Sequence, residues 1–227
     1  FPATQIAALR VYNLTGSSEI VISGCPSIDV CSAVKDIPPV TIREISGSGP
    51  IIDPAGRFAL CLQHADTIVW RDAYTQMIAT LFALERASIP VMIQWPNADA
   101  GGAGIAKAIR VFRNDHPAMA LHTLPNLPPQ RFLRLLTQAT VLVGNSSCGI
   151  RESSFLGVPS VTIGDRQRGR ERSKNVIAVP HNEAAIEAAM RAAGEATGLI
   201  DFSTQVWGPR IEYRGGDVTL SALGQQA

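Results

Sequence analysis

Two hydrophobic patterns alternate along the chain. Short runs rich in Val, Ile and Leu are separated by longer segments in which apolar residues recur every three or four positions. The short runs are typical of strands buried on both faces of a parallel sheet, and the longer segments are typical of amphipathic helices. The pattern therefore predicts a succession of strand–helix–strand units.

The predicted fold class is α/β: an open, doubly wound parallel sheet of the Rossmann-like type. The expected strands are Ile20–Ser23, Arg57–Gln63, Pro90–Gln94, Ala118–Thr123, Thr140–Gly144, Ser160–Ile163 and Asn175–Val179. The expected helices are Ala3–Leu14, Trp70–Ala87, Ala103–Asn114, Pro128–Gln138, Gly149–Leu156 and Glu183–Ala193.

The chain divides into three expected parts. Ser46–Gly56 holds three Gly and two Pro, which indicates a linker. Residues 1–56 are therefore expected to be a lead-in segment with the first strand and this linker. Residues 57–205 are expected to form the sheet domain, and residues 206–227 a C-terminal segment.

Composition narrows the class of protein. A chain of 227 residues with 46% hydrophobic residues can bury one substantial core. Its net charge of +1 gives no overall field toward nucleic acid or a membrane surface, and no apolar run reaches the length of a membrane span. The four cysteines form no CxxC pair, which indicates free thiols in a reducing compartment. We expect a cytoplasmic protein with neither nucleic-acid nor membrane partners.

Polar residues concentrate in the segments that follow the expected strands. In open α/β sheets, ligands bind outside the carboxyl ends of the strands. Five such segments carry His, Asn, Asp, Ser, Glu and Arg side chains, namely Gln63–Asp66, Trp95–Gly102, Leu124–Pro129, Gly144–Glu152 and Gly164–Arg170. Because these segments share one edge of the predicted sheet, they indicate a site for a polar ligand.

The segment Gly144–Glu152 has the features of a phosphate site. A strand is expected to end at Gly144, and Asn145, Ser146 and Ser147 then turn into a helix. Unpaired N–H groups at a helix start attract phosphate, the serine hydroxyls add donors, and Gly149 leaves the backbone open to approach. The alternative is that one of the three polar residues only caps the helix, which leaves the other two unexplained.

Glu152 and Arg166 extend this hypothesis. A carboxylate such as Glu152 near a helix start is usually a surface complement to the helix dipole, but it can also accept hydrogen bonds from two ribose hydroxyls. Arg166 follows the next expected strand, and its planar guanidinium suits oxyanions. Arg168 and Arg172 are expected to face solvent.

His64 is the candidate catalytic residue. A lone histidine is more often structural, but His64 lies on the same expected edge as the phosphate site, where it could pass a proton or assist a leaving diphosphate. His116, His122 and His181 lack that context. The sequence contains no GxGxxG or P-loop lysine motif, no Gly-x-Ser-x-Gly elbow and no metal-ligand spacing, so we expect neither a metal nor a bound cofactor.

Four stretches together resemble one enzyme family. "ISGCPSID", "PNADAG", "GNSSCGIRE" and "IGDRQRGR" followed by "NVI" are similar to segments of the hydrolysing UDP-N-acetylglucosamine 2-epimerases. The resemblance extends from the start of the chain to Val206–Gly208. It implies the second domain of a GT-B-type fold, preceded by an N-terminal domain that this chain lacks, so the chain beginning at Phe1 is expected to be a fragment.

The resemblance also implies roles for particular residues. Ser146 and Ser147 would hold the diphosphate of a UDP-sugar, Glu152 the ribose, and Arg166 the phosphate. Asn97 would contribute to the nucleotide-sugar site, and the backbone at Leu127 would face the uracil. His64 matches the functional histidine of the family, although Ala65 replaces the proline that often follows it.

The family reaction eliminates UDP from UDP-N-acetylglucosamine and adds water to give N-acetylmannosamine, in sialic-acid or related surface-sugar biosynthesis. The resemblance further implies a homodimer, a C-terminal segment that packs back on the missing domain, and an inactive fragment. Three alternatives stay open: a non-hydrolysing epimerase, the donor domain of a GT-B glycosyltransferase, and a stand-alone nucleotide-sugar-binding module.

Overall fold

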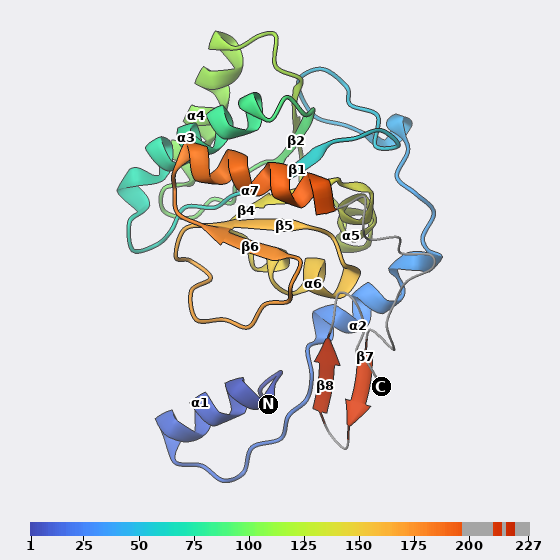
Figure 1. Cartoon of the computed structure of the whole chain (residues 1–227), viewed down its shortest axis with the longest axis vertical. Helices are drawn as coiled ribbons and strands as arrows, with labels where there is room; N and C mark the ends of the chain where they lie inside the picture. The colour runs from blue at the N-terminus through green and yellow to red at the C-terminus, as the bar shows by residue number, and fades with distance from the viewer. Residues whose placement is uncertain (197–210, 215–216, 221–227) are drawn as a thin grey trace.

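A sheet of six parallel strands forms the centre of the molecule, in the order β3-β2-β1-β4-β5-β6 (Figure 1). The computed structural model describes residues 1–196, 211–214 and 217–220. The strands are β1 (Ala59–Leu62), β2 (Val91–Gln94), β3 (Leu121–Leu124), β4 (Val141–Gly144), β5 (Ser160–Ile163) and β6 (Val176–Val179). The chain winds outward from β1 in one direction and from β4 in the other, so the predicted doubly wound fold is confirmed.

Helices cover both faces of this sheet (Figure 1). The helices on one face are α3 (Ala73–Arg86), α4 (Gly102–Asp115) and α7 (Glu183–Ala196), and those on the other are α2 (Pro26–Ser32), α5 (Pro129–Gln138) and α6 (Glu152–Leu156). Successive residues of a strand point to opposite faces. Thus Ala59 and Cys61 enter the first core, whereas Leu60 and Leu62 enter the second. This double burial explains the nearly continuous apolar runs in the sequence.

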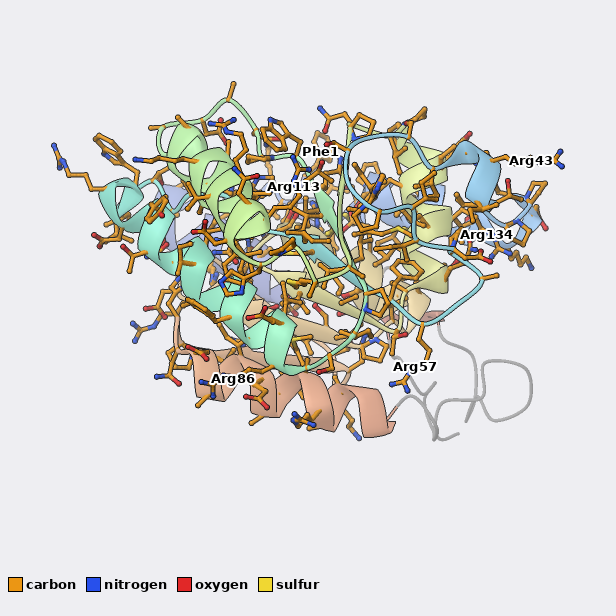
Figure 2. All side chains as sticks on the ribbon, turned by 90° about the horizontal axis from the view of Figure 1, so that it is seen from above. Phe1, Arg43, Arg57, Arg86, Arg113 and Arg134 are labelled. Atoms are coloured by element: carbon orange, nitrogen blue, oxygen red, sulfur yellow. The ribbon has the colours of Figure 1, made fainter. Side chains whose placement is uncertain are left out.

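The predicted linker is attached to the edge of the sheet. Ser48 and Thr123 of β3 exchange two backbone hydrogen bonds, with N–O distances of 3.0 and 2.8 Å. Arg113, labelled in Figure 2, donates from Nη1 to Ser48 Oγ at 2.9 Å. The segment therefore covers the backbone groups that the outermost strand would otherwise expose. On the first face, the Nε atom of Arg86 (Figure 2) pairs with Glu183 at 2.6 Å and links α3 to α7.

One predicted strand is wrong, and one helix was not predicted. Residues 20–23 lie outside any sheet, and the backbone N–H of Ser23 bonds only to Pro2 O, at 3.0 Å. Helix α1 (Gln5–Thr15) confirms the first predicted helix. Helix α2 was missed because its seven residues begin with Pro26 and include β-branched Ile28 and Val30, a pattern that periodicity alone does not reveal.

The segment between α2 and β1 belongs to the core of the sheet domain. It contains the short 3₁₀ turns η1 (Val34–Asp36) and η2 (Ile42–Glu44), and a third turn, η3 (Trp70–Asp72), precedes α3. Its buried apolar residues, which join the second core, are Val34, Val40, Ile45, Ile52 and Phe58. The core under this face thus starts well before residue 57.

Strands β7 (Ile211–Arg214) and β8 (Asp217–Leu220) pair antiparallel with each other. The predicted packing of residues 206–227 on another domain otherwise falls outside the described residues. Within the described part of the chain, every helix is too short or too polar to cross a membrane.

Candidate functional site

The site is built where the winding of the sheet reverses, between β1 and β4. Leu62 of β1 and Gly144 of β4 are register partners at the carboxyl ends of the two strands. Gly144 has φ +140°, and a Cβ there would lie 2.1 Å from the carbonyl oxygen of Leu62. Only glycine allows this approach, so the loops after the two strands, which begin at Gln63 and Asn145, leave the sheet in contact.

Asn145 joins three of these loops. Its side chain accepts from the backbone N–H of His64 at 2.8 Å and donates to the carbonyl of His64 at 2.7 Å. Its own carbonyl accepts from Arg166 Nη1 at 3.3 Å and from Gln167 Nε2 at 2.9 Å. The side chain of Asn145 is fully buried, so these bonds are shielded from water. Asn145 therefore holds the loops after β1, β4 and β5 together.

The serine turn differs from its prediction. The expected helix Gly149–Leu156 is split into a 3₁₀ turn, η4 (Ser147–Gly149), and the five-residue α6. Ser146 caps the turn and accepts from the N–H of Cys148 at 3.4 Å. A Cβ on Gly149 would lie 2.8 Å from Ser160 Oγ, so this glycine serves packing against β5. The phosphate hypothesis consequently depends on Ser146 and Ser147, both partly exposed, and not on a long helix.

Glu152 is a buried carboxylate with an unused oxygen. It is only 7% exposed and stands at the first position of α6, which contradicts the surface dipole complement considered above. Its Oε1 lies 3.2 Å from Arg151 Nη2, which is also 3.3 Å from Ser147 Oγ. Oε2 is buried and has no partner among the described residues. A buried acceptor without a donor is costly in free energy, so Oε2 is suited to receive a ligand hydroxyl.

His64 lies beside Arg166, with one buried ring nitrogen unused. The residue is 9% exposed, and Nδ1 has no partner among the described residues. Burial lowers the pKa of His64, the charge of Arg166 lowers the pKa further, and Asp99 opposes the shift. At neutral pH the imidazole is therefore neutral, so one ring nitrogen can donate a hydrogen bond and the other can accept one.

A second histidine stands on the same edge of the sheet and was not predicted. His181 follows β6, and its ring lies over Gly164, where an added Cβ would be 2.3 Å from Nε2. Burial lowers the pKa of His181, while the charges of Asp66 and Asp165 oppose that shift. Its position in the sequence could have indicated this, because only Pro180 separates His181 from the end of the predicted strand Asn175–Val179.

The two remaining predicted residues lie on the outer loops of the same edge. Asn97 follows β2 and is exposed, and Leu127 follows β3 and packs partly on the second core. The Asn97 loop borders the site, since a Cβ on Gly101 would lie 2.6 Å from the Cβ of Ala65. His64 and Arg166 thus contact Asn145, and Ser146 follows it in the chain. Ser147 and Glu152 are linked to each other through Arg151, and Asn97 and Leu127 lie on the outer loops.

The groups described above can offer a ligand hydrogen bonds and charge. Over the described residues, no three His, Cys, Asp or Glu side chains are grouped as metal ligands. Burial raises the pKa of the Cys31, Cys61 and Cys148 thiols to about 12, so these thiols are not nucleophiles at neutral pH.

The chain is similar to known proteins over much of its length. UDP-N,N'-diacetylbacillosamine 2-epimerase (hydrolyzing) of Legionella pneumophila is 27% identical over 194 residues, which are 85% of this chain and 50% of that protein. UDP-N-acetylglucosamine 2-epimerase of Neisseria meningitidis is 33% identical over 160 residues, 70% of this chain and 40% of that protein. The chain therefore spans about half the length of the relatives it matches, or less.

The fold comparison extends over nearly the whole chain. The S. aureus MnaA–UDP co-structure is similar with a TM-score of 0.65 and 13% identity, covering 99% of this chain and 55% of that one. The profile of the UDP-N-acetylglucosamine 2-epimerase family matches residues 1–205. Together with the switch-point loops, this match shows that the chain belongs to the UDP-N-acetylglucosamine 2-epimerase family.

Proposed function

We propose that this chain is the UDP-binding half of a hydrolysing UDP-sugar 2-epimerase. The nucleotide lies across the switch point between β1 and β4, with the diphosphate on Ser146 and Ser147 and the ribose on Glu152. Arg166 faces the diphosphate, and Asn97 and the backbone at Leu127 border the sugar and the uracil. The hydrolysing names of relatives such as the Legionella protein favour the hydrolysing subtype over the non-hydrolysing one.

The observation that carries this proposal is the buried, unused oxygen of Glu152. Its partner oxygen is engaged by Arg151, and Oε2 has no donor among the described residues. A pair of neighbouring hydroxyls satisfies such a carboxylate, because each hydroxyl donates one hydrogen bond to it. Ribose presents such a pair, and the serine hydroxyls beside Glu152 are donors for the attached phosphates.

His64 acts on the departing diphosphate in this proposal. As UDP leaves, negative charge grows on its terminal phosphate, and a hydrogen bond that strengthens with that charge lowers the barrier. The neutral imidazole of His64 supplies such a donor next to Arg166. The groups that move the proton at C2 of the sugar are expected in residues outside this chain.

Product analysis of the full-length enzyme tests the reaction class. With UDP-N-acetylglucosamine and no acceptor, we expect release of UDP and free N-acetylmannosamine. A product that is still attached to UDP would identify a non-hydrolysing epimerase, and no turnover without an acceptor would favour a glycosyltransferase. We expect the 227-residue chain alone to bind UDP without turnover, and sugar release by that chain would contradict its role as one half of the site.

Replacing His64 separates catalysis from binding. In the full-length enzyme, His64→Ala is expected to lower kcat roughly 10²–10⁴-fold, with a much smaller change in UDP affinity. His116→Ala is the matched control, since His116 pairs with Glu85 on the surface of α3 and α4. Near-normal turnover of the His64 variant would make this residue structural.

The sugar is also part of the proposal. N-acetylglucosamine is the first choice, and the similarity to the Legionella enzyme makes the diacetamido-trideoxy sugar of UDP-N,N'-diacetylbacillosamine the second. A homodimer, a cytoplasmic location and a role in sialic-acid or related surface-sugar biosynthesis stay predictions.

A further inference from the structure

A groove of about 470 Å³ lies between α1 and the loop that joins β5 to β6. In Figure 1 this loop extends from the sheet toward α1. Arg10 donates from Nη2 to the carbonyl of Gly169, and Thr4 donates to a carboxylate oxygen of Glu171. Among the described residues that line the groove, none is a nucleotide ligand proposed above. The groove is therefore lined by residues other than the proposed nucleotide ligands.

The charged residues that line this groove are mostly arginines. Four arginines line it, namely Arg10, Arg151, Arg170 and Arg172. Two carboxylates offset part of their charge: Glu171, which also lines the groove, and Glu152, which pairs with Arg151 at 3.2 Å. The remaining excess is positive, and each guanidinium carries five N–H donors, more than the contacts described here use. Apolar groups such as Ile22, Ile28 and Ile150 complete the lining.

Arg151 connects this groove with the proposed nucleotide site. Its side chain lines the groove, while its Nη2 contacts Ser147 Oγ at 3.3 Å and Glu152 Oε1 at 3.2 Å. Its Nε is buried and has no partner among the described residues. An anion in the groove would attract the same guanidinium that now engages a proposed diphosphate ligand and the proposed ribose ligand.

We propose that the groove is a second binding site, for a small molecule that bears a phosphate group, and that Arg151 couples it to the nucleotide site. A phosphate dianion matches the excess arginine charge, whereas a carboxylate offsets only half as much. Arginine forks bind phosphate through paired hydrogen bonds. By linkage, phosphate and UDP change each other's affinity by the same factor. This coupling rests on the proposed function, but the anion site itself does not.

Calorimetric titration of the 227-residue chain with inorganic phosphate tests the anion site. Arg172→Met is expected to weaken phosphate binding roughly tenfold, because one charged donor is lost. Arg168→Met is the matched control: Arg168 is exposed on the same loop but does not line the groove, so its removal should change the affinity less than about twofold. Acetate at equal ionic strength should bind far more weakly than phosphate.

The anion site would be overturned if phosphate did not bind, if acetate bound equally well, or if the Arg168 and Arg172 variants lost phosphate affinity equally. It would also be overturned if only Ser147→Ala lowered the phosphate affinity, because phosphate would then bind at the proposed nucleotide site. Arg10→Met, on a different element, provides an independent second variant. The coupling is tested by measuring UDP affinity with and without phosphate. The two affinities should differ in the wild type and should be equal in Arg172→Met. Unchanged UDP affinity would reject the coupling alone, whereas failure of UDP to bind would reject the proposed function and leave the phosphate result intact.

Discussion

The inner and outer loops at the carboxyl edge of the sheet are built differently. The inner loops, after β1, β4 and β5, are tied together through the fully buried Asn145. The outer loops, after β2 and β3, carry the exposed Asn97 and the partly exposed Leu127. The inner loops are therefore preorganised by the fold itself, and a ligand need not order them. Changes in the inner loops should cost stability, whereas changes in the outer loops should affect only binding.

The largest expected effect is that of Gly144→Ala. The new Cβ would meet the Leu62 carbonyl at 2.1 Å, and φ +140° is strained for alanine. We expect the free energy of unfolding to fall by roughly 4 kcal/mol or more, measured by urea denaturation. Gly104→Ala is the control, because its Cβ has no heavy atom closer than 3.4 Å and lies inside α4. That variant should be neutral or more stable by up to about 1 kcal/mol, and equal losses in both variants would refute the strained approach.

Asn145→Ala compared with Asn97→Ala tests the contrast directly. Removing the Asn145 side chain leaves the buried N–H and carbonyl of His64 without partners, which should cost roughly 2–4 kcal/mol of stability. Asn97 is exposed, so its replacement should change stability by less than about 0.5 kcal/mol. Similar effects in the two variants, measured by thermal and urea unfolding, would remove the distinction between inner and outer loops.

A smaller effect is expected in the pH dependence of stability. Because burial lowers the pKa of His64 in the folded chain, the unfolded chain binds the proton more readily. Stability is therefore complete above the ordinary histidine pKa of about 6.5 and falls as the pH drops toward the folded value, by at most about 1.4 kcal/mol per pH unit for one group.

In His64→Gln, the loss of stability on acidification should be smaller than in the wild type. His181→Gln should reduce the same loss independently, since the pKa of His181 is also lowered. Urea unfolding between pH 7.5 and pH 5 is the measurement, with pH values chosen to bracket roughly 6.5. If the free energy of unfolding depended on pH in both variants as it does in the wild type, the buried, neutral state of both rings would be contradicted.

The fold was predictable wherever burial repeats with a fixed period. All six strands of the sheet and the helices between them follow from alternating apolar runs, because both faces of the sheet are covered. The strand predicted at residues 20–23 was wrong because an apolar run does not reveal whether a neighbouring strand is available for pairing. Helix α2 was not predicted because its seven residues are too few to show a helical period.

The candidate site was predictable by position and less so by contact. The edge on which it lies follows from the strand ends, so the sequence alone could place His64, Ser147 and Glu152 at that edge as candidates. The role of Asn145 as a tie between loops depends on contacts 81 residues apart in the chain, which no local pattern contains. For the same reason the sequence did not reveal that Gly149 packs against β5.

Glu152 provides the most direct test of the account. Binding of UDP and of 2′,3′-dideoxy-UDP is measured by calorimetry for the wild type and for Glu152→Ala. If Oε2 of Glu152 accepts from the ribose, the wild type should prefer UDP by about tenfold or more, corresponding to roughly 1.5–3 kcal/mol for a lost charged hydrogen bond, and the variant should bind both ligands about equally. A variant that keeps the full preference for UDP would show that Glu152 is not the ribose ligand, and the proposed position of the nucleotide at the β1–β4 switch point would be wrong.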